Sequence, residues 1–211
     1  KEKGLVRIAS SPSLVSTLVI PALEEFRASY SNIEFSVHQE NAKNVSEQLR
    51  LGFVEIGLHE RWKNMGILSS ELLLTDNYGL VCSAEHPLAT QSMVSFNDIA
   101  NSTVIQLSHD TAIRKHLDAD IGISEFVRAD IETSDATSLI WMISQNIGVS
   151  VLPENAIMIP TNKNLCFVPI KGFTKNRKLY LLSHSKRIVS PAAAAFMNIV
   201  REVAQRHSKC L

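Results

Sequence analysis

The stretch Arg7–Phe26, RIASSPSLVSTLVIPALEEF, decides which fold we expect. Its first residues, with Leu5 and Val6 before them, are apolar and suited to a β-strand. The strand breaks at Ser10–Ser13, and a helix with one apolar face is predicted to follow, because apolar side chains then recur every three or four residues. That face consists of Leu14, Val15, Leu18, Val19, Ala22, Leu23 and Phe26. A strand that feeds such a helix is the first half of a βαβ unit, and open α/β folds bind ligands beside the carboxyl ends of their strands.

The turn between this strand and helix is the first candidate ligand site. Ser11 or Ser13 would cap the helix, because the N–H groups of a first helical turn have no partner within the helix. Serine hydroxyls and free N–H groups at such a position hold small polar or anionic molecules. The alternative is that the serines only cap the helix, since most capped helices bind no ligand.

Two further strands and a helix follow. Ile33–Gln39 alternates apolar and polar residues and predicts a second strand, and Glu55–Leu58 predicts a short third one. Between them, Asn44–Gly52 predicts a helix with Asn44 as its cap and Gly52 at its end. This order of elements predicts parallel strands joined by right-handed crossovers.

The middle of the chain predicts a second lobe. Ile67–Leu74 and Tyr78–Ser83 together would form one long strand that leaves the first lobe and enters the second. A last strand, Lys178–Ser183, would return to the first lobe. Ser190-Pro191 then opens a final amphipathic helix, because proline suits the first helical position.

The strand–polar turn–helix arrangement recurs within this second lobe. One copy is predicted at Ser108 and another at Ser134, where Ser134 or Asp135 would cap a helix that Gly148 ends. The recurrence concerns the arrangement of elements and not a residue-level repeat. It predicts further polar turns at the carboxyl ends of strands.

The composition narrows the classes of function. The 211 residues are 45% hydrophobic and 20% charged, as in an ordinary globular protein. Lys+Arg and Asp+Glu both number 21, so the basic excess of a nucleic-acid-binding domain is missing. No apolar run approaches the roughly 20 residues that span a bilayer. We therefore expect no membrane partner and no direct binding of DNA by this chain.

Metal, disulfide and catalytic patterns are also poor. The cysteines, Cys82, Cys166 and Cys210, are odd in number and widely spaced, which favours a reducing compartment without a disulfide framework. No histidine pair has helical metal-ligand spacing with a third ligand nearby, so no metal and no cofactor is predicted. The chain has no nucleophile elbow, zinc-binding helix or phosphate-binding loop, and we expect no enzyme.

Several segments in this order resemble the effector-binding domain of LysR-type transcriptional regulators. Leu51-Gly52 followed by Glu55–Leu58 is similar to a Gly–xx–Asp–hydrophobic segment of that family, with Glu55 in place of the commoner Asp. The other matching segments are LVRIASSP, LVIPALEEF, IEFSVHQENAKNVSEQLRLG, LVCSAEHPLA, ETSDATSLIWMISQNIGVSVLP and the closing amphipathic helix.

The resemblance implies an α/β fold of two lobes, like that of type 2 periplasmic binding proteins, with a ligand cleft between them. Residues 4–76 and 181–211 would form the first lobe and residues 77–180 the second, joined by two crossover strands. The family's N-terminal winged helix-turn-helix, which would bind DNA, has no counterpart in this sequence. We therefore expect the sensing part of a cytoplasmic regulator, whose contact with DNA would run through that missing domain.

The resemblance also implies which residues contact a small effector. They lie at the ends of strands and the starts of helices in both lobes. The expected effector-binding residues are Ser10, Ser11, Pro12, Ser13, His59, Glu60, Ser108, His109, Thr133 and Ser134.

Uncharged donors in these turns suit a carboxylate or another small anion. His59 and His109 would add a charge-assisted hydrogen bond, because a modest pKa change moves histidine across neutral pH. Alternatively, both histidines are exposed loop residues. The turns hold no lysine or arginine, so a full positive charge would have to come from elsewhere, such as Arg7, Arg61 or Arg114.

By the same resemblance, helices at Leu14–Tyr30 and Thr137–Asn146 are candidates for the face of a homodimer, and the resemblance also implies a homotetramer. Alternatively, their apolar side chains serve only the core of their own subunit. For the whole chain, the alternatives to a regulator are an extracytoplasmic solute-binding protein of the same fold and a small α/β enzyme.

Overall fold

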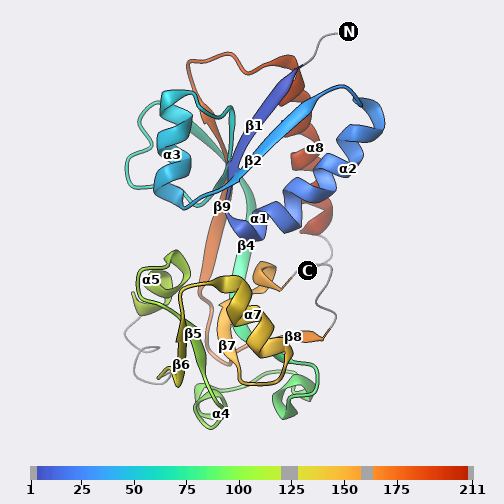
Figure 1. Ribbon diagram of the computed structural model, residues 1–211. Helices are drawn as coiled ribbons and strands as arrows, with labels where there is room; N and C mark the ends of the chain where they lie inside the picture. Colours follow the sequence, from blue (N-terminus) through green and yellow to red (C-terminus); the bar gives the residue numbers. More distant parts are fainter. Residues whose placement is uncertain (1–3, 120–127, 158–163, 209–211) are drawn as a thin grey trace. The chain divides into compact units, whose positions relative to one another are not determined.

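The computed structural model describes residues 4–119, 128–157 and 164–208. The chain forms two compact units. Unit 1 comprises residues 1–75 and 177–211, and unit 2 comprises residues 76–176. The chain passes between the units in β4 (Leu68–Ser83) and in β9 (Asn176–His184), both visible in Figure 1. The predicted long strand across residues 67–83 is confirmed, because β4 runs without interruption.

Unit 1 is built on a sheet whose strands follow the order β2-β1-β3-β9-β4. The remaining strands of this sheet are β1 (Leu5–Ser10), β2 (Glu34–Gln39) and β3 (Ile56–His59). β1 pairs in parallel with β2 and with β3, as predicted, whereas β3 and β9 are antiparallel. The parallel pairs place the carboxyl ends of β1 and β3, namely Ser10 and the residues beside Leu58, at one edge of the sheet.

The helix after β1 is interrupted by a wider turn. It begins as α1 (Pro12–Leu14), continues as a π-helical segment, η1 (Val15–Val19), and resumes as α2 (Ile20–Ser29). Pro21 follows the π segment, and a proline inside a helix lacks an N–H and crowds the carbonyl four residues earlier. We attribute the π segment to this proline, which the apolar periodicity alone did not reveal.

Helices cover both faces of the unit 1 sheet. α2 and α8 (Pro191–His207) lie side by side on one face, and α3 (Ala42–Leu51) lies on the other (Figure 1). Between α2 and α8, the rings of Phe26 and Phe196 meet edge to face with centroids 5.7 Å apart. Successive side chains of β1 point to opposite faces of the sheet, so Ile8 packs toward α2 and α8 while Ala9 packs toward α3.

The predicted cap of α3 is wrong by one turn. Asn41 caps the helix, and its Oδ1 accepts the N–H of Asn44 over 3.0 Å. Asn44 therefore lies within the first turn. The predicted end is confirmed, because Gly52 adopts the left-handed conformation (φ 79°) that closes many helices.

Unit 2 has a second sheet with helices on both of its faces. β4 pairs antiparallel with β7 (Ser150–Pro153) and with β8 (Leu165–Val168). β5 (Ile105–Leu107) and β6 (Ile131–Thr133) form a parallel pair, which adjoins β7 through a bridge between Val104 and Val149. One core cluster lies under α7 (Ala136–Ser144), and another lies under α4 (Phe96–Ala100) and α5 (Ala112–Asp118).

The predicted role of Gly148 as the end of α7 is also wrong. α7 ends at Ser144, and Asn146 takes the positive φ of 56° after it. Gly148 is instead required by a close approach of two backbones, because a Cβ at this position would lie 2.4 Å from the carbonyl oxygen of Thr103. Among the described residues, no helix has both the length and the apolarity that crossing a membrane requires.

Candidate functional site

Several hydrogen bonds made by its own groups stabilise the polar turn after β1. Ser11 is the N-cap of α1, and its Oγ accepts the N–H of Leu14 over 3.4 Å. Ser10 is fully buried, and its hydroxyl donates to the carbonyl of Ser11 over 3.2 Å. The N–H of Ser11 donates to the carbonyl of Leu58 over 3.0 Å, which ties the end of β1 to the end of β3. Pro12 is exposed and has no N–H to offer a ligand.

A cation from the far end of the chain lies beside this turn. Arg177, on β9, is only 5% exposed, and its Nη2 donates to Oγ of Ser13 over 3.0 Å. Oγ of Ser13 also lies 3.5 Å from Oγ of Ser11. The sequence indicated no lysine or arginine in this turn, and nothing local in LVRIASSP points to a residue on a strand that comes so much later.

His59 lies at the end of β3, next to the same turn. It is 5% exposed, so the alternative that it is an exposed loop residue is wrong. Burial, and secondarily the charge of Arg177, lower the pKa of His59 to about 4. The expected positive charge on His59 near neutral pH is therefore wrong, since the ring is neutral there. Its Nδ1 accepts the N–H of Glu60 over 2.7 Å, which fixes the ring and leaves Glu60 half-buried beside it.

Of the three cations proposed from sequence, Arg61 and Arg114 are engaged elsewhere. The guanidinium of Arg61 lies 4.4 Å from the centroid of the Tyr180 ring, and its Nε donates to Ser70 over 2.9 Å. Arg7 is exposed on β1. Arg114 lies in unit 2, where its Nε donates to Asp118 over 2.6 Å. Of the cations discussed so far, Arg177 is the one with a hydrogen bond to the serine turn.

In unit 2, the turn after β5 contains its own acid. The hydroxyl of Ser108 donates to Oδ1 of Asp110 over 2.8 Å, and this bond is the main cause that lowers the pKa of Asp110. His109 is exposed, in agreement with the alternative interpretation, and its Nδ1 lies 2.9 Å from Oδ2 of Asp118. The N–H of Ser108 donates to the carbonyl of Thr133 over 2.9 Å, which joins this turn to the one after β6.

The turn after β6 is organised by Asp135. Asp135 caps α7, because its Oδ2 accepts the N–H of Ser138 over 2.7 Å, and this bond is the main cause that lowers its pKa. Oγ of Thr133 accepts the N–H of Asp135 over 3.3 Å. Ser134 is exposed, and its hydroxyl makes no hydrogen bond to any residue that the structure describes. Of the two caps left open by the sequence, Asp135 is the one observed.

The two units therefore present turns of opposite character. The unit 1 turn combines serine hydroxyls, a neutral buried histidine and the charge of Arg177. The unit 2 turns combine Ser108, Thr133 and Ser134 with two ionised aspartates, Asp110 and Asp135. Charge alone makes the unit 1 turn the better place for an anionic group. In the part of the chain that the structure describes, no three His, Cys, Asp or Glu side chains gather as a metal site would require.

Comparison with known proteins gives the family. The family model of the LysR substrate binding domain matches residues 1–205. The uncharacterized HTH-type transcriptional regulator YfeR of Shigella flexneri is 26% identical over 94% of this chain and 65% of its own length. The transcriptional dual regulator GltC of Bacillus subtilis is 24% identical over 94% of this chain and 67% of its own length. The chain thus spans about two thirds of the length of these relatives.

Solved structures agree in fold. The effector binding domain of QuiR in complex with shikimate has a TM-score of 0.74 at 20% identity, covering 98% of this chain and 99% of its own. The Synechocystis PCC6803 CcmR regulatory domain in complex with 2-PG has a TM-score of 0.78 at 17% identity, covering 96% and 98%. These likenesses confirm the predicted fold, that of type 2 periplasmic binding proteins. The chain belongs to the LysR substrate-binding domain family.

Proposed function

We propose that this chain senses a small anionic effector and passes the signal to an attached DNA-binding region of a transcriptional regulator. The observation that carries the anionic class is the hydrogen bond from buried Arg177 to Ser13, because it brings a full positive charge to the serine turn. A guanidinium beside hydroxyl donors matches a carboxylate or a similar oxyanion. Ser11, Ser13, Arg177 and His59 would form the contacts in unit 1. Ser108, His109, Thr133 and Ser134 would form those in unit 2.

The relatives support a regulator rather than a solute-binding protein or an enzyme. YfeR and GltC are both named as transcriptional regulators. QuiR and CcmR are each seen with a small molecule, shikimate and 2-PG. We extend both features to this chain, and with them a non-catalytic role in the cytoplasm. Residues beyond this chain would supply the contact with DNA.

The signal would arise from differential affinity. An effector that binds one arrangement of the protein more tightly than another shifts the population toward the first. A molecule that binds both arrangements equally shifts nothing, however tightly it binds. The tests must therefore show which molecules bind and which of the polar turns contributes to their binding.

The first experiment is a thermal-shift screen of this chain. The probes are small carboxylates including shikimate, amino acids, aromatic acids, inorganic anions and 2-PG, each at constant ionic strength. A molecule that binds the folded state raises the melting temperature in a concentration-dependent way. We expect hits among the anions and none among matched neutral analogues. A screen in which neutral analogues stabilise as well as the anions would contradict the proposal.

Serine variants then locate the site. Ser11→Ala removes a helix cap and lowers the melting temperature by itself, so the quantity to compare is the ligand-induced rise and not the absolute value. We expect that rise to shrink in Ser11→Ala and in Ser134→Ala. Ser36→Ala on β2 and Ser144→Ala at the end of α7 are matched controls that should keep the full rise. A hit that is unaffected in both test variants would refute the assigned residues while leaving the sensor role in place.

We also propose that the chain self-associates through α2 and α7, which overlap the segments Leu14–Tyr30 and Thr137–Asn146. Support comes from large apolar side chains on these helices that are exposed on the surface of the subunit. Ile20 is 43% exposed and Trp141 is 58% exposed. We expect Trp141→Lys to raise the dissociation constant of a dimer at least tenfold in sedimentation equilibrium. Trp62→Lys, at an exposed tryptophan outside both helices, is the control and should leave it unchanged.

A further inference from the structure

Two cysteines face each other across neighbouring strands of unit 2. Cys82 on β4 lies directly opposite Cys166 on β8 in the antiparallel register, and both are free thiols. Their side chains lie on the same face of the sheet, because Cys166 packs against the core cluster under α4 and α5 that contains Cys82. Their strand neighbours Val81 and Phe167 belong to the cluster on the other face, under α7. The fold therefore brings together two thiols from distant parts of the sequence.

The backbone geometry of this pair is compatible with a disulfide. The N–H of Ala84 donates to the carbonyl of Asn164 over 2.7 Å, and these two residues are the next opposite pair in the same register. Hydrogen-bonded and non-hydrogen-bonded pairs alternate along an antiparallel ladder, so Cys82 and Cys166 also form a hydrogen-bonded pair, whose Cα atoms lie about 5.5 Å apart. Disulfides most often join Cα atoms that are roughly 5.5–6 Å apart.

A disulfide at this place would be strained and therefore reversible. Opposite Cβ atoms in a sheet lie roughly 4.5–5.5 Å apart, whereas a disulfide needs roughly 3.5–4.5 Å, so the two strands must approach by about 1 Å. The shift involves a short segment, because β8 has only 4 residues. Strained disulfides are more easily reduced than relaxed ones, and such labile bonds are the ones that proteins use transiently.

The two thiols differ in their access to solvent. Cys82 is fully buried, whereas Cys166 is half-buried. Burial, and secondarily the neighbouring Cys166, raise the pKa of Cys82 to about 11. Since the thiolate is the attacking species, a reagent from solvent meets Cys166 first, and Cys82 acts only as the second thiol.

We propose that Cys82 and Cys166 form a reversible oxidation site for a low-molecular-weight disulfide, RSSR. Sγ of Cys166 attacks one sulfur of RSSR, so that a bond forms between them, the S–S bond of the reagent breaks and one RS⁻ leaves. Sγ of Cys82 then attacks Sγ of Cys166, the bond between the two cysteines forms, and a second RS⁻ leaves. The protons of the two cysteines convert both RS⁻ to RSH, and two electrons pass from the protein to the reagent. The inference goes beyond the proposed function and does not depend on it.

The first test brings the folded chain to equilibrium with mixtures of oxidised and reduced glutathione. Cys210→Ser removes the third thiol, and acid stops the exchange before mass spectrometry. We expect a species that has lost two hydrogen atoms, carries no glutathione and links the peptides of Cys82 and Cys166. At the same reduced glutathione, half-oxidation in urea should need roughly tenfold more oxidised glutathione or a larger excess, because the unfolded chain does not hold the thiols together. By the same thermodynamic cycle, oxidation should raise the melting temperature.

Variants in the Cys210→Ser background test the role of each thiol. Cys82→Ala should keep glutathione on Cys166 as a mixed disulfide, because the second thiol is missing. Cys166→Ala should take up little glutathione, because Cys82 is buried. In the matched control, Cys166→Ala is combined with Val168→Cys, which moves the thiol along the same face to a position diagonal to Cys82, roughly 7–8 Å away. This control should not give the linked species.

Several results would overturn the proposal. They are a folded chain that does not react, one that carries glutathione on Cys166 without a link to Cys82, and equal half-oxidation in the folded chain and in urea. A link in the Val168→Cys control that forms as readily as in the parent chain would overturn it too, as would a link that dithiothreitol fails to reduce in the folded chain. None of these results alters the expected responses of Ser11→Ala and Ser134→Ala, so the two proposals fail or succeed separately.

Discussion

Arg177 donates from Nη2 to Oγ of Ser13 over 3.0 Å, although 164 positions separate the two residues in the chain. The bond joins β9 to the turn after β1, within unit 1. It gives a charge to a turn whose own residues have none. The charge of the same guanidinium is the second cause of the low pKa of His59. One buried cation therefore acts on both Ser13 and His59.

Removing the charge of Arg177 should weaken the binding of an anion at this turn. We expect Arg177→Gln to reduce the affinity for an anionic hit of the screen by roughly ten- to a hundredfold, the range for losing a hydrogen bond to a charged group. Arg177→Lys should lie between this variant and the wild type, because lysine keeps the charge but not the planar fork. Isothermal titration calorimetry measures all three affinities. Lys178→Gln, at the exposed neighbour on β9, is the control, and unchanged binding in Arg177→Gln would contradict the prediction.

The buried state of His59 should make stability depend on pH below neutrality. The folded chain keeps the ring neutral down to pH of about 4, whereas the unfolded chain protonates it near 6.5. Between these values the unfolded state binds more protons, so the free energy of unfolding rises with pH and falls as acid is added. Through His59 alone, the free energy of unfolding should fall by about 2 kcal/mol when the pH is lowered from 7 to 5.

Urea unfolding of the wild type and of His59→Gln at both pH values measures this contribution. The loss between pH 7 and pH 5 should be about 2 kcal/mol smaller in His59→Gln. His38→Gln, at an exposed histidine on β2, should retain the loss seen in the wild type. The prediction would be wrong if His59→Gln and the wild type lost the same free energy over this interval.

The elements that local chemistry determines were predictable from sequence. Alternation and helical periodicity located β1, β2 and the final helix, and Ser190 caps α8 with Pro191 behind it, as the sequence predicted. The parallel pairing of β1 with β2 and with β3 followed from the βαβ pattern, because helical connections of that length fit parallel strands. These features depend on residues that lie within a few positions of one another.

What the sequence did not reveal depends on contacts between distant residues. Nothing near Arg177 indicates that it reaches Ser13, and nothing near Cys82 indicates that Cys166 lies opposite. The need for glycine at position 148 comes from a backbone carbonyl more than forty residues earlier, Thr103. The predicted effector contacts stay predictions. Cys210 lies outside the described residues.

A side chain at position 148 should destabilise unit 2. The Cβ of Gly148→Ala would lie 2.4 Å from the carbonyl oxygen of Thr103, which is backbone and cannot turn away. We expect a loss of about 2 kcal/mol or more in the free energy of unfolding by urea, as for other overpacked sites. Gly172→Ala is the comparison, because it has a positive φ of 74° but open space around its Cβ. Its strain should cost about 1 kcal/mol, and equal losses in the two variants would refute the argument.

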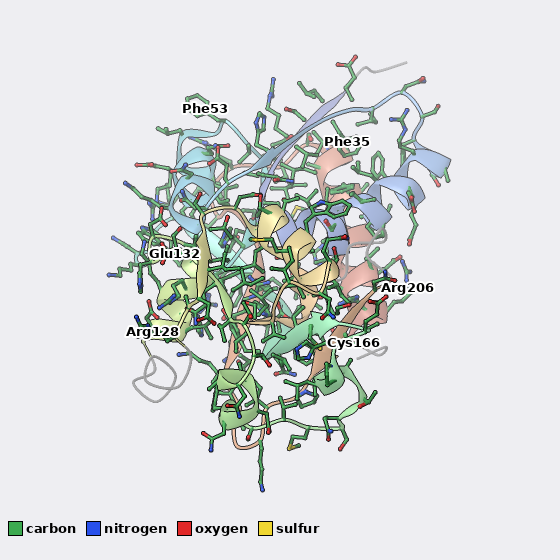
Figure 2. All side chains as sticks on the ribbon, turned by 60° about the horizontal axis from the view of Figure 1, so that its bottom comes forward. Phe35, Phe53, Arg128, Glu132, Cys166 and Arg206 are labelled. Carbon is green, nitrogen blue, oxygen red and sulfur yellow. The ribbon has the colours of Figure 1, made fainter. Side chains whose placement is uncertain are left out.

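The thiol of Cys82 should react slowly with alkylating agents, although a second cysteine faces it. Cys82 on β4 lies directly opposite Cys166 on β8, whose side chain is labelled in Figure 2. Burial, and secondarily the neighbouring Cys166, raise the pKa of Cys82 from 9.0 to about 11. Only the thiolate reacts with alkylating agents, so its reactive fraction near pH 8 falls about a hundredfold. We expect iodoacetamide to label Cys82 far more slowly than half-buried Cys166.

Mass spectrometry of peptides after timed pulses of iodoacetamide measures both rates in one sample, and Cys210→Ser removes the third thiol from the reaction. Raising the pH from 8 to 10 should speed the labelling of Cys82 by about tenfold per unit, because each unit below the pKa changes the thiolate fraction tenfold. In urea, where burial is lost, the rates at Cys82 and Cys166 should become similar. Rapid labelling of Cys82 in the folded chain at pH 8 would show that this thiol is reached by solvent, and would contradict the low reactivity that its buried position on β4 predicts.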